Sequence, residues 1–533
     1  QFTLKDFWRV NEKLTWSNIA YLSIGRGGGQ RYYGSSSTII RDSVGQIAWN
    51  EIEYNNKWIS QFGMLIPTTD ASYDDDLLKS SQILSASVNN HMWIGGISQF
   101  DYTVNDKWKT SGGLDYRWYK GSHYVEVKNL LGGDYFVSTS NANADSPMNV
   151  VGDKISDASK PYQNYRDAFV QWAGAFGQAE YSHGRWNAFV NISGVSSGYK
   201  GVDYFRKKSM QVGDSLVEIG YADTVVLNGQ TITRETEGLE FDNTGWIWKI
   251  GGTFKAGANF NVTEKSNVFI NLGYLSRTPQ YSNVVDNNKN EFFADIKNEV
   301  IYAFEAGYGF RSKKLSINAN GYYTVWKNKP FPFGIQVPDP NDPLETVTAN
   351  VTGMDALHMG VEVDASYRVH KKLTIEGMVS VGDWTWQSSE TIDVVGTQYI
   401  IDAKGVHVGD AAQSTAALSL RFAPIKRGYI KVKYTFFDRY YSDFDPFKLQ
   451  GSLGGTESWQ MPEYGLMSIH VGYRFKFEKS SLVLRGNVFN ALNTLYISDA
   501  RASSLYGNDF TANSVGVFIG QGIRFNLSLG FEF

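Results

Sequence analysis

The sequence predicts an all-β protein, a transmembrane antiparallel β-barrel, and three observations lead to this prediction. The closing residues, 523–533, alternate strictly between large apolar and small or polar side chains, which is the pattern of a strand with two unlike faces. Aromatic residues make up 15% of the chain, with 53 glycines and only 12 prolines, as is typical of strands bordered by aromatic girdles. Short polar turns alternate with long loops along the chain, as in membrane barrels.

The length and the apolar runs support the same class. The chain has 533 residues, more than the roughly 250–300 that a single soluble core usually serves, whereas a large barrel has no central core to fill. No run of about 18 apolar residues occurs, so a transmembrane helix is not expected. The chain opens on Gln1 in strand-like sequence without a targeting signal. For an exported protein, we expect that its beginning has been removed or lies outside this sequence.

Charge and cysteine content exclude several function classes. The formal net charge is −4 and there is no cysteine, which excludes disulfides and thiolate sites and gives no nucleic-acid footprint. The seven histidines are scattered and form no HExxH motif. No Ser/His/Asp set has recognisable spacing, as a barrel protease or lipase would need. We therefore expect no enzyme, no cofactor and no metal site.

The elements follow a regular order from the first residue to the last. Short turns lie near residues 11–13, 105–107, 183–185, 263–266, 312–314, 370–372, 424–427 and 478–480. Long connections rich in Asp, Asn, Ser, Gly and Tyr lie near residues 27–87, 122–165, 206–243, 278–297, 329–356, 388–411, 442–463 and 491–517. Because long loops of such barrels are extracellular, residues 1–533 are interpreted as one barrel domain with its long loops outside the cell.

The strands between these turns alternate as the closing strand does. Residues 361–369 and 467–477 each place apolar side chains on one face and charged or small ones on the other. A charge that faced lipid at the bilayer midplane would cost about 2–4 kcal/mol, so we expect apolar rows outward and charged rows toward an enclosed lumen. The charged residues expected to face the lumen are Glu362, Asp364, Arg368, Arg474 and Arg524.

The strand count predicts that the barrel is incomplete. Eight hairpins and the closing strand give about 17 strands. The first strand, residues 2–10, runs toward a short turn and the last runs away from a long loop, so both point the same way. Bacterial barrels have even strand numbers, and an open edge in lipid leaves backbone groups unpaired. We therefore expect about five further strands ahead of Gln1, in a barrel of about 22.

Four stretches resemble TonB-dependent outer-membrane transporters, in that family's order. They are YLSRTPQYSNVV (274–285), EVIYAFEAGYGFRSKKLSINANGYYTVWKNK (299–329), HMGVEVDASYR (358–368) and NVFNALNTLYISDA (487–500). They are similar to the family's R-x-P-x-x-S-N loop, its E-x-G hairpin, its G-hydrophobic-E strand and its late N-x-F-N segment. The closing Phe533 resembles the C-terminal signal that the barrel-assembly machinery reads. The chain thus resembles the C-terminal barrel portion of such a receptor over nearly its whole length.

The resemblance implies active import of a scarce solute across the bacterial outer membrane. The family carries an N-terminal plug and a box that pairs with TonB, and neither is visible here, nor are the first strands. The implied partners are TonB, through that plug, and the outer-membrane lipids; a surface lipoprotein lid is left open. The lumen charges would then pair with each other or with the plug.

The cargo and two other functions stay open on sequence alone. The Tyr-, Trp-, Asn- and Asp-rich loops look more like those of transporters of glycan or peptide fragments than those of compact siderophore receptors. The alternatives are a passive porin-like channel, and a barrel that serves as a secretion or adhesion component.

Candidate binding residues lie where strands meet long loops. Trp384 and Trp386, beside Asp383, can stack on a sugar or an aromatic solute, although girdle aromatics at the membrane interface are the more frequent reading. Tyr440 and Tyr441 precede one acidic cluster, residues 443–445, and a second lies at residues 73–76. These clusters could hold Ca²⁺, but neither has calcium-loop spacing, and solvated charge is favoured. Arg26–Gly29 is too bare to cradle a phosphate.

Overall fold

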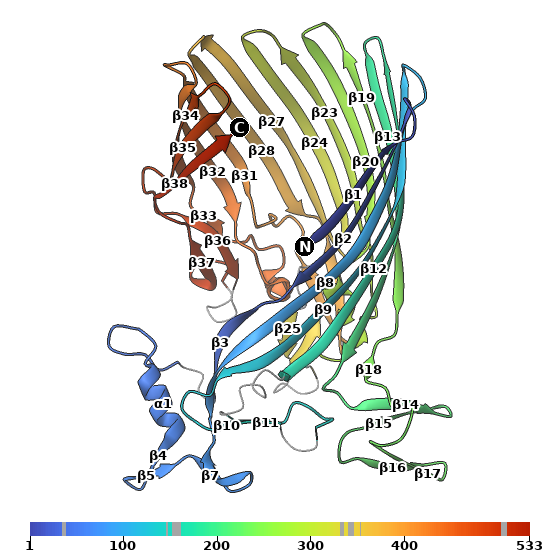
Figure 1. The fold of residues 1–533 in the computed structure, drawn as a ribbon, viewed down its shortest axis with the longest axis vertical. Helices are drawn as coiled ribbons and strands as arrows, with labels where there is room; N and C mark the ends of the chain where they lie inside the picture. Colours follow the sequence, from blue (N-terminus) through green and yellow to red (C-terminus); the bar gives the residue numbers. More distant parts are fainter. Residues whose placement is uncertain are drawn as a thin grey trace.

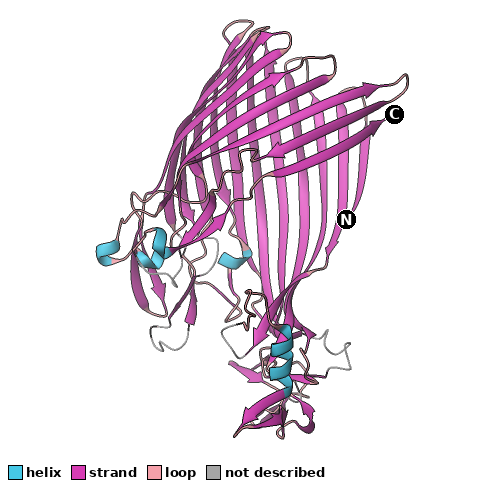
Figure 2. Ribbon diagram, turned by 90° about the vertical axis from the view of Figure 1, so that its left-hand side faces the viewer, coloured by secondary structure: helices cyan, strands magenta, loops and turns pink. Residues whose placement is uncertain are grey.

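The computed structural model describes residues 1–34, 39–144, 148–151, 161–330, 335–338, 340, 346–351, 353–502 and 509–533. Its main feature is one antiparallel sheet of 20 strands that curls into a barrel wall (Figure 1, Figure 2). The crossing strands are β1 (Phe2–Arg9), β2 (Leu14–Gly25), β8 (Gln82–Thr103), β9 (Trp108–Asn129), β12 (Pro161–His183), β13 (Trp186–Asp203), β19 (Ile247–Asn261), β20 (Ser266–Arg277), β23 (Glu299–Arg311), β24 (Leu315–Lys329), β27 (Met354–His370), β28 (Leu373–Trp386), β31 (Ala412–Phe422), β32 (Gly428–Tyr441), β34 (Tyr464–Lys476), β35 (Ser481–Phe489) and β38 (Arg524–Glu532).

Three further members of the sheet only prolong a crossing strand. β3 (Gly28–Gly34) pairs with β8 beyond the end of β2, β18 (Asp242–Asn243) pairs with β13 ahead of β19, and β33 (Gln460–Met461) pairs with β32 ahead of β34. The remaining 17 strands of the sheet form the barrel wall. The predicted all-β antiparallel barrel of about 17 strands is therefore confirmed.

The short turns lie together at one end of the wall, where polar side chains cap them. The side chain of Asn11 accepts hydrogen bonds from the backbone nitrogens of Lys13 and Leu14, at 2.8 and 2.9 Å. Asn105 does the same for Lys107 and Trp108. Asx turns of this kind close a hairpin locally, so these connections need few residues.

The long connections lie at the opposite end and carry small elements of their own (Figure 1). These are α1 (Trp49–Lys57), β4 (Trp58–Gln61), β5 (Met64–Pro67), β6 (Thr69–Asp70), β7 (Asp74–Leu78), β10 (Tyr135–Ser138), β11 (Met148–Val151), β14 (Lys208–Val212), β15 (Ser215–Ile219), β16 (Thr224–Leu227), β17 (Gln230–Thr233), β21 (Val285–Asp286), β22 (Glu291–Phe292), β25 (Ile335–Pro338), β26 (Thr346–Ala349), β29 (Ser389–Val394), β30 (Thr397–Asp402), β36 (Ile497–Ala502), β37 (Val515–Ile519) and the 3₁₀ turns Tyr281–Asn283, Pro446–Lys448, Gly451–Leu453 and Ala512–Ser514. In the described ranges, none of the helices has the length and apolar character needed to cross a bilayer.

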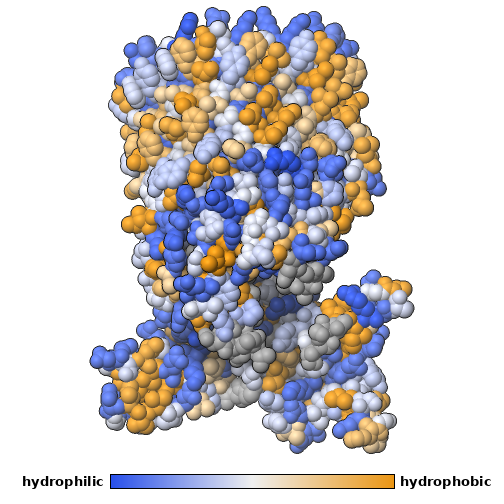
Figure 3. Space-filling view, turned by 180° about the vertical axis from the view of Figure 1, so that it is seen from behind, coloured by the Kyte–Doolittle hydropathy of each residue, from blue (hydrophilic) through white to orange (hydrophobic). Residues whose placement is uncertain are grey.

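The register places the apolar rows on the outer face. Phe525 and Leu527 of β38 are 82% and 74% exposed, and the opposing strand β35 presents Val488 and Gly486 to them on the same face. In Figure 3 the hydrophobic side chains gather in a band over the part of the wall near the short turns, and a more hydrophilic surface follows toward the loops. That band is the part of the wall suited to lipid.

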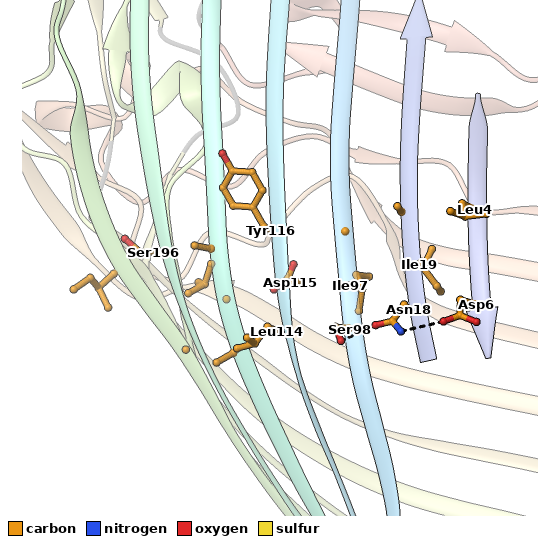
Figure 4. Close-up of a pocket in the computed structure, with 18 residues that line it drawn as sticks. Leu4, Asp6, Asn18, Ile19, Ile97, Ser98, Leu114, Asp115, Tyr116 and Ser196 are labelled. Atoms are coloured by element: carbon orange, nitrogen blue, oxygen red, sulfur yellow. Dashed lines mark hydrogen bonds between the residues drawn. The ribbon is translucent and has the colours of Figure 1, made fainter. Parts of the chain in front are cut away.

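Asp6 breaks the expected division between outer and inner rows. Asp6 of β1 lies on the outer face, where Asn18 of β2 donates a hydrogen bond to it at 3.4 Å and Ser98 of β8 donates to Asn18 at 2.8 Å (Figure 4). The expectation that all charged rows line the lumen is therefore wrong at Asp6. The polar chain Asp6–Asn18–Ser98 partly satisfies a carboxylate that would otherwise stand alone in an apolar band.

The same outer region is hollowed. A groove of about 860 Å³ runs across β1, β2, β8, β9, β12 and β13 (Figure 4). Its floor is made of small side chains, which lower the surface between larger neighbours. The small residues are Ala20, Gly96, Ala173, Ala175 and Gly194.

The two edges of the sheet are open. β1 pairs only with β2, and β38 pairs only with β35, so these two described strands form no ladder with each other. Both point toward the short-turn end, so antiparallel pairing between them is not available.

The wall is taller on one side than on the other. β8, β9 and β12 have 22, 22 and 23 residues, whereas β31, β35 and β38 have 11, 9 and 9. The long strands extend toward the loop end (Figure 1).

Candidate functional site

The inner face of the wall contains a cavity at the loop end. It has a volume of about 350 Å³ and lies where β20, β23, β24, β27 and β28 give way to their loops. Ligand pockets usually measure roughly 300–1,000 Å³ and combine apolar walls with a few polar groups. Size and position therefore make this cavity the candidate binding site.

Aromatic rings form the middle of the cavity. The ring of Trp384 stacks on His358 at 5.3 Å between centroids and 14° between planes, and Trp326 lies 5.7 Å from the other side of His358. The indole nitrogen of Trp384 donates to the Tyr322 hydroxyl at 2.9 Å. Nε2 of His358 is buried and has no hydrogen-bond partner among the described residues. The stack thus lines the cavity with aromatic rings and keeps one ring nitrogen buried without a described partner.

The backbone of Trp384 is fixed by one amide side chain. Gln413, which is buried, accepts a hydrogen bond from the Trp384 nitrogen at 2.9 Å and donates to the Trp384 carbonyl at 3.0 Å. This bidentate contact replaces strand pairing where β28 runs past the end of β31. The indole is therefore held rigidly.

Cations lie on the β20–β24 side of these rings. Arg277 pairs with the buried carboxylate of Glu299 at 3.4 Å, and Lys297 pairs with Asp295 at 2.7 Å. Lys329 has no carboxylate partner among the described residues; its ammonium lies 5.0 Å from the centroid of the Trp326 ring. Lys329 is thus the cation of this wall that no described carboxylate compensates.

Carboxylates lie on the opposite side, in the loops next to β31 and β32. Asp410 is exposed and has a left-handed backbone conformation, with φ of 69°. Asp443 is partly buried and accepts a hydrogen bond from the Phe444 nitrogen at 2.9 Å. Burial first, and then the nearby charge of Asp410, raises the pKa of Asp443 to about 6. Neither carboxylate forms an ion pair with a described residue.

A hydrophobic core inside the loops supports the cavity from behind. It includes Trp386, which is 5% exposed, with Ile401, Val406, Phe444 and Leu449. The edge of Phe444 meets the Trp386 ring at 6.3 Å between centroids. Because these loops share one packed core, they can hold the charges of the cavity in place.

The structure separates the five residues predicted to bind. Trp384 and Trp386 line the cavity, so the girdle reading of these two rings is wrong. Asp383 lies on the other face of β28, within 3.4 Å of Arg439 and of His407. Tyr441 is buried and its ring stacks on that of His407 at 4.2 Å. Tyr440 donates to the Asp410 carbonyl at 3.3 Å. These three frame the cavity without lining it.

The residues predicted to face the lumen all lie on the inner rows. Asn320 donates to Glu362 at 3.4 Å and Asn318 donates to Asp364 at 3.1 Å. The three arginines also have neighbours on the wall. Arg368 lies opposite Thr374, and Arg474 donates hydrogen bonds to Glu532 and Ser481. Arg524 lies over the Phe489 ring, 5.7 Å from its centroid. Their role toward a plug or a substrate stays a prediction.

Carboxylates of the two acidic clusters accept hydrogen bonds from nearby backbone nitrogens and so stabilise their own loops. The carboxylate of Asp74 accepts from the nitrogens of Asp76 and Leu77, and Asp445 caps a 3₁₀ turn through the Phe447 nitrogen. Over the described ranges, no group of three or more His, Asp or Glu side chains is placed to hold a metal.

Sequence reasoning missed Lys329, His358 and Asp410. His358 had one available signal, because it alternates with the apolar outer residues of its strand. The loop residues had none, since a cavity assembled from segments far apart in the chain depends on the order of strands around the wall. A second aromatic group on the inner face, in which Trp93 and Trp172 stack at 5.5 Å and 7°, was missed for the same reason.

Comparisons with known proteins agree with this architecture. A family model described as TonB dependent receptor-like, beta-barrel, matches residues 6–491. Solved structures similar in fold include the copper transporter OprC (14% identity, TM-score 0.57), the ferric-catecholate import receptor Fiu from E. coli K12 (13%, 0.57) and the ferric citrate transporter FecA (12%, 0.58). Each alignment covers 99% of this chain but only 65%, 63% and 60% of the other chain. No curated protein sequence matches the chain.

Proposed function

Because the chain belongs to the TonB-dependent receptor family of β-barrels, we propose that it forms the barrel wall of an active importer in the bacterial outer membrane. The match of the family model over residues 6–491 carries this proposal. The apolar outer band and the polar inner face support it, since such a wall suits a membrane on one side and a wet or protein-filled lumen on the other.

The open edges support a larger barrel than the described strands make. Backbone groups along β1 and β38 have no ladder on one side, and each such group exposed to lipid costs several kcal/mol. We propose that further strands bridge the two edges, in a barrel of about 22 strands, and that a plug occupies the lumen and connects it to TonB.

In this function the cavity captures the solute before TonB opens a path. The solute that we propose is a glycan or peptide fragment, because stacked rings with charged groups around them recognise flat or polar solutes. The wall itself makes and breaks no bonds. Its roles are rigidity, a polar lumen and loops that bind.

The test compares growth on limiting peptides or on oligosaccharides as the sole nutrient. We expect loss of the barrel gene and loss of TonB to give the same growth defect on one of the two nutrients. Growth on that nutrient should be restored only when the barrel gene and TonB are both present. A defect that follows the barrel gene but not TonB would instead identify a passive channel. Normal growth of both mutants on both nutrients would contradict import of either fragment class.

A further inference from the structure

The charges of the cavity are sorted by position around the wall. Going from β20 to β32, the lining changes from Arg277 and Lys329, through the rings of His358 and Trp384, to a carboxylate end. Arg277 is already neutralised by Glu299. Among the described residues, what remains is a cation without an ion pair at one end, a flat apolar middle and two carboxylates without an ion pair, Asp410 and Asp443, at the other.

The spacing of strands gives the separation of the two ends across the sheet. From β24, which carries Lys329, to β31, which Asp410 precedes, there are three steps across the sheet, by way of β27 and β28. At ~4.8 Å per step the ends lie ~14 Å apart. An extended peptide covers ~3.3–3.6 Å per residue, so about three or four residues reach from one end to the other once the lysine side chain is allowed for.

From this arrangement we propose that the cavity binds a short linear peptide with both ends free, its carboxylate at Lys329 and its amine between Asp410 and Asp443. The proposal rests on the import function and narrows its solute class. A flat or aromatic side chain in the middle of the peptide lies against Trp384 and His358.

A neutral glycan fits this cavity less well. The C–H face of a sugar can stack on the rings, but its hydroxyls leave Lys329 and both carboxylates without partners of opposite charge. Removing such charges from water without a counter-charge is unfavourable. A zwitterion compensates both ends at once, and blocking either of its termini removes one contact.

The experiment is isothermal titration calorimetry on the full-length protein in detergent. The probes are the tripeptide Ala-Tyr-Ala, its N-acetylated form, its C-amidated form and maltotriose. We expect the free tripeptide to bind and each blocked form to bind about tenfold or more weakly, because each loses one hydrogen-bonded charge pair. Maltotriose is expected to bind more weakly than either.

Two variants assign the ends. Lys329→Met should weaken the free tripeptide to the level of the C-amidated form and remove the difference between those two probes. Asp410→Asn should reduce the effect of N-acetylation while leaving that of C-amidation. Lys404→Met, which changes an exposed loop lysine outside the cavity, is the matched control and should bind as the unmodified protein does.

Equal affinity of the free and blocked tripeptides, tighter binding of maltotriose, or no binding of any probe would overturn the proposal without any variant. These results are separable from the import function. Binding in the expected order together with TonB-independent growth would contradict import alone. TonB-dependent growth with no preference for free termini would contradict the peptide assignment alone.

Discussion

At the scale of single residues, the cavity depends on polar groups that the fold leaves uncompensated. Lys329, Asp410 and Asp443 have no ion-pair partner in the described part of the chain, while nearby Arg277 and Lys297 each have one. Glu299 and Asp295 serve those two cations and so leave none of the described carboxylates of that wall for Lys329. The selectivity of the cavity therefore rests on few side chains.

The pKa of Asp443 predicts a pH dependence of stability. Its folded pKa is raised to about 6, mainly by burial, from an ordinary value of 3.8. The folded state therefore holds the proton more tightly than the unfolded state, so this stabilising contribution is complete below pH 3.8 and is lost as pH rises through about 6.

Asp443→Asn should remove that dependence, so the thermal midpoint of the variant should exceed that of the unmodified protein above pH 6 and approach it below pH 4. Thermal unfolding in detergent between those values measures it. Asp445→Asn, in the same loop, is the control because asparagine caps a turn as aspartate does. A constant difference between the Asp443→Asn variant and the unmodified protein at every pH would refute the assignment to Asp443.

At the scale of the strands, alternation made most of the wall predictable from sequence. A period of two in a strand assigns each side chain to a face without knowledge of its neighbours, so Val363 and Asp364 could be separated in advance. The same rule places Asp6 on the apolar face of its strand, but the partners that make this position tolerable could not be predicted, because Asn18 and Ser98 lie on other strands. The cavity was hidden for a similar reason, since Lys329 and Asp410 meet only when the order of the strands between them is known.

Charge introduced on the two faces of β27 should have opposite consequences. Val363→Arg places a cation in the apolar outer band and should destabilise the barrel by about 2–4 kcal/mol, depending on its depth in the bilayer. Ser366→Arg faces the lumen opposite Glu376 and should be tolerated. Urea unfolding of both variants in lipid vesicles checks this. Equal destabilisation would mean that the faces are assigned wrongly.

At the scale of the whole molecule, the open edges determine what can close the wall. Because β1 and β38 point the same way, direct contact between them would put a parallel pair, which is slightly less stable per residue, into an otherwise antiparallel barrel. A set of intervening strands of odd number restores the alternation. The sequence could predict this because strand direction follows from counting turns.

Residues 1–533 contain no cysteine, so cysteine pairs introduced into the edge strands can be tested without competition from other thiols of this part of the chain. Cysteines at Leu484 and Leu529, which are opposed in the β35–β38 ladder, should cross-link on mild oxidation. Cysteines at Leu4 and Leu529 should not, because intervening strands would hold them farther apart than the roughly 7 Å limit between Cα atoms of a disulfide. Efficient cross-linking of the second pair, seen as a mobility shift in gels, would show that β1 and β38 are neighbours.

The unequal height of the wall determines the side from which a large solute reaches the cavity. At ~3.3 Å per residue, β8 and β9 are ~70 Å long, and even when tilted they extend well beyond the roughly 30 Å of hydrocarbon. The strands β31, β35 and β38 are much shorter, so the barrel wall is lower on their side. We propose that the loop end faces away from the cell, so that a peptide that arrives over the shorter strands reaches Asp410 before Lys329 and enters with its amine leading.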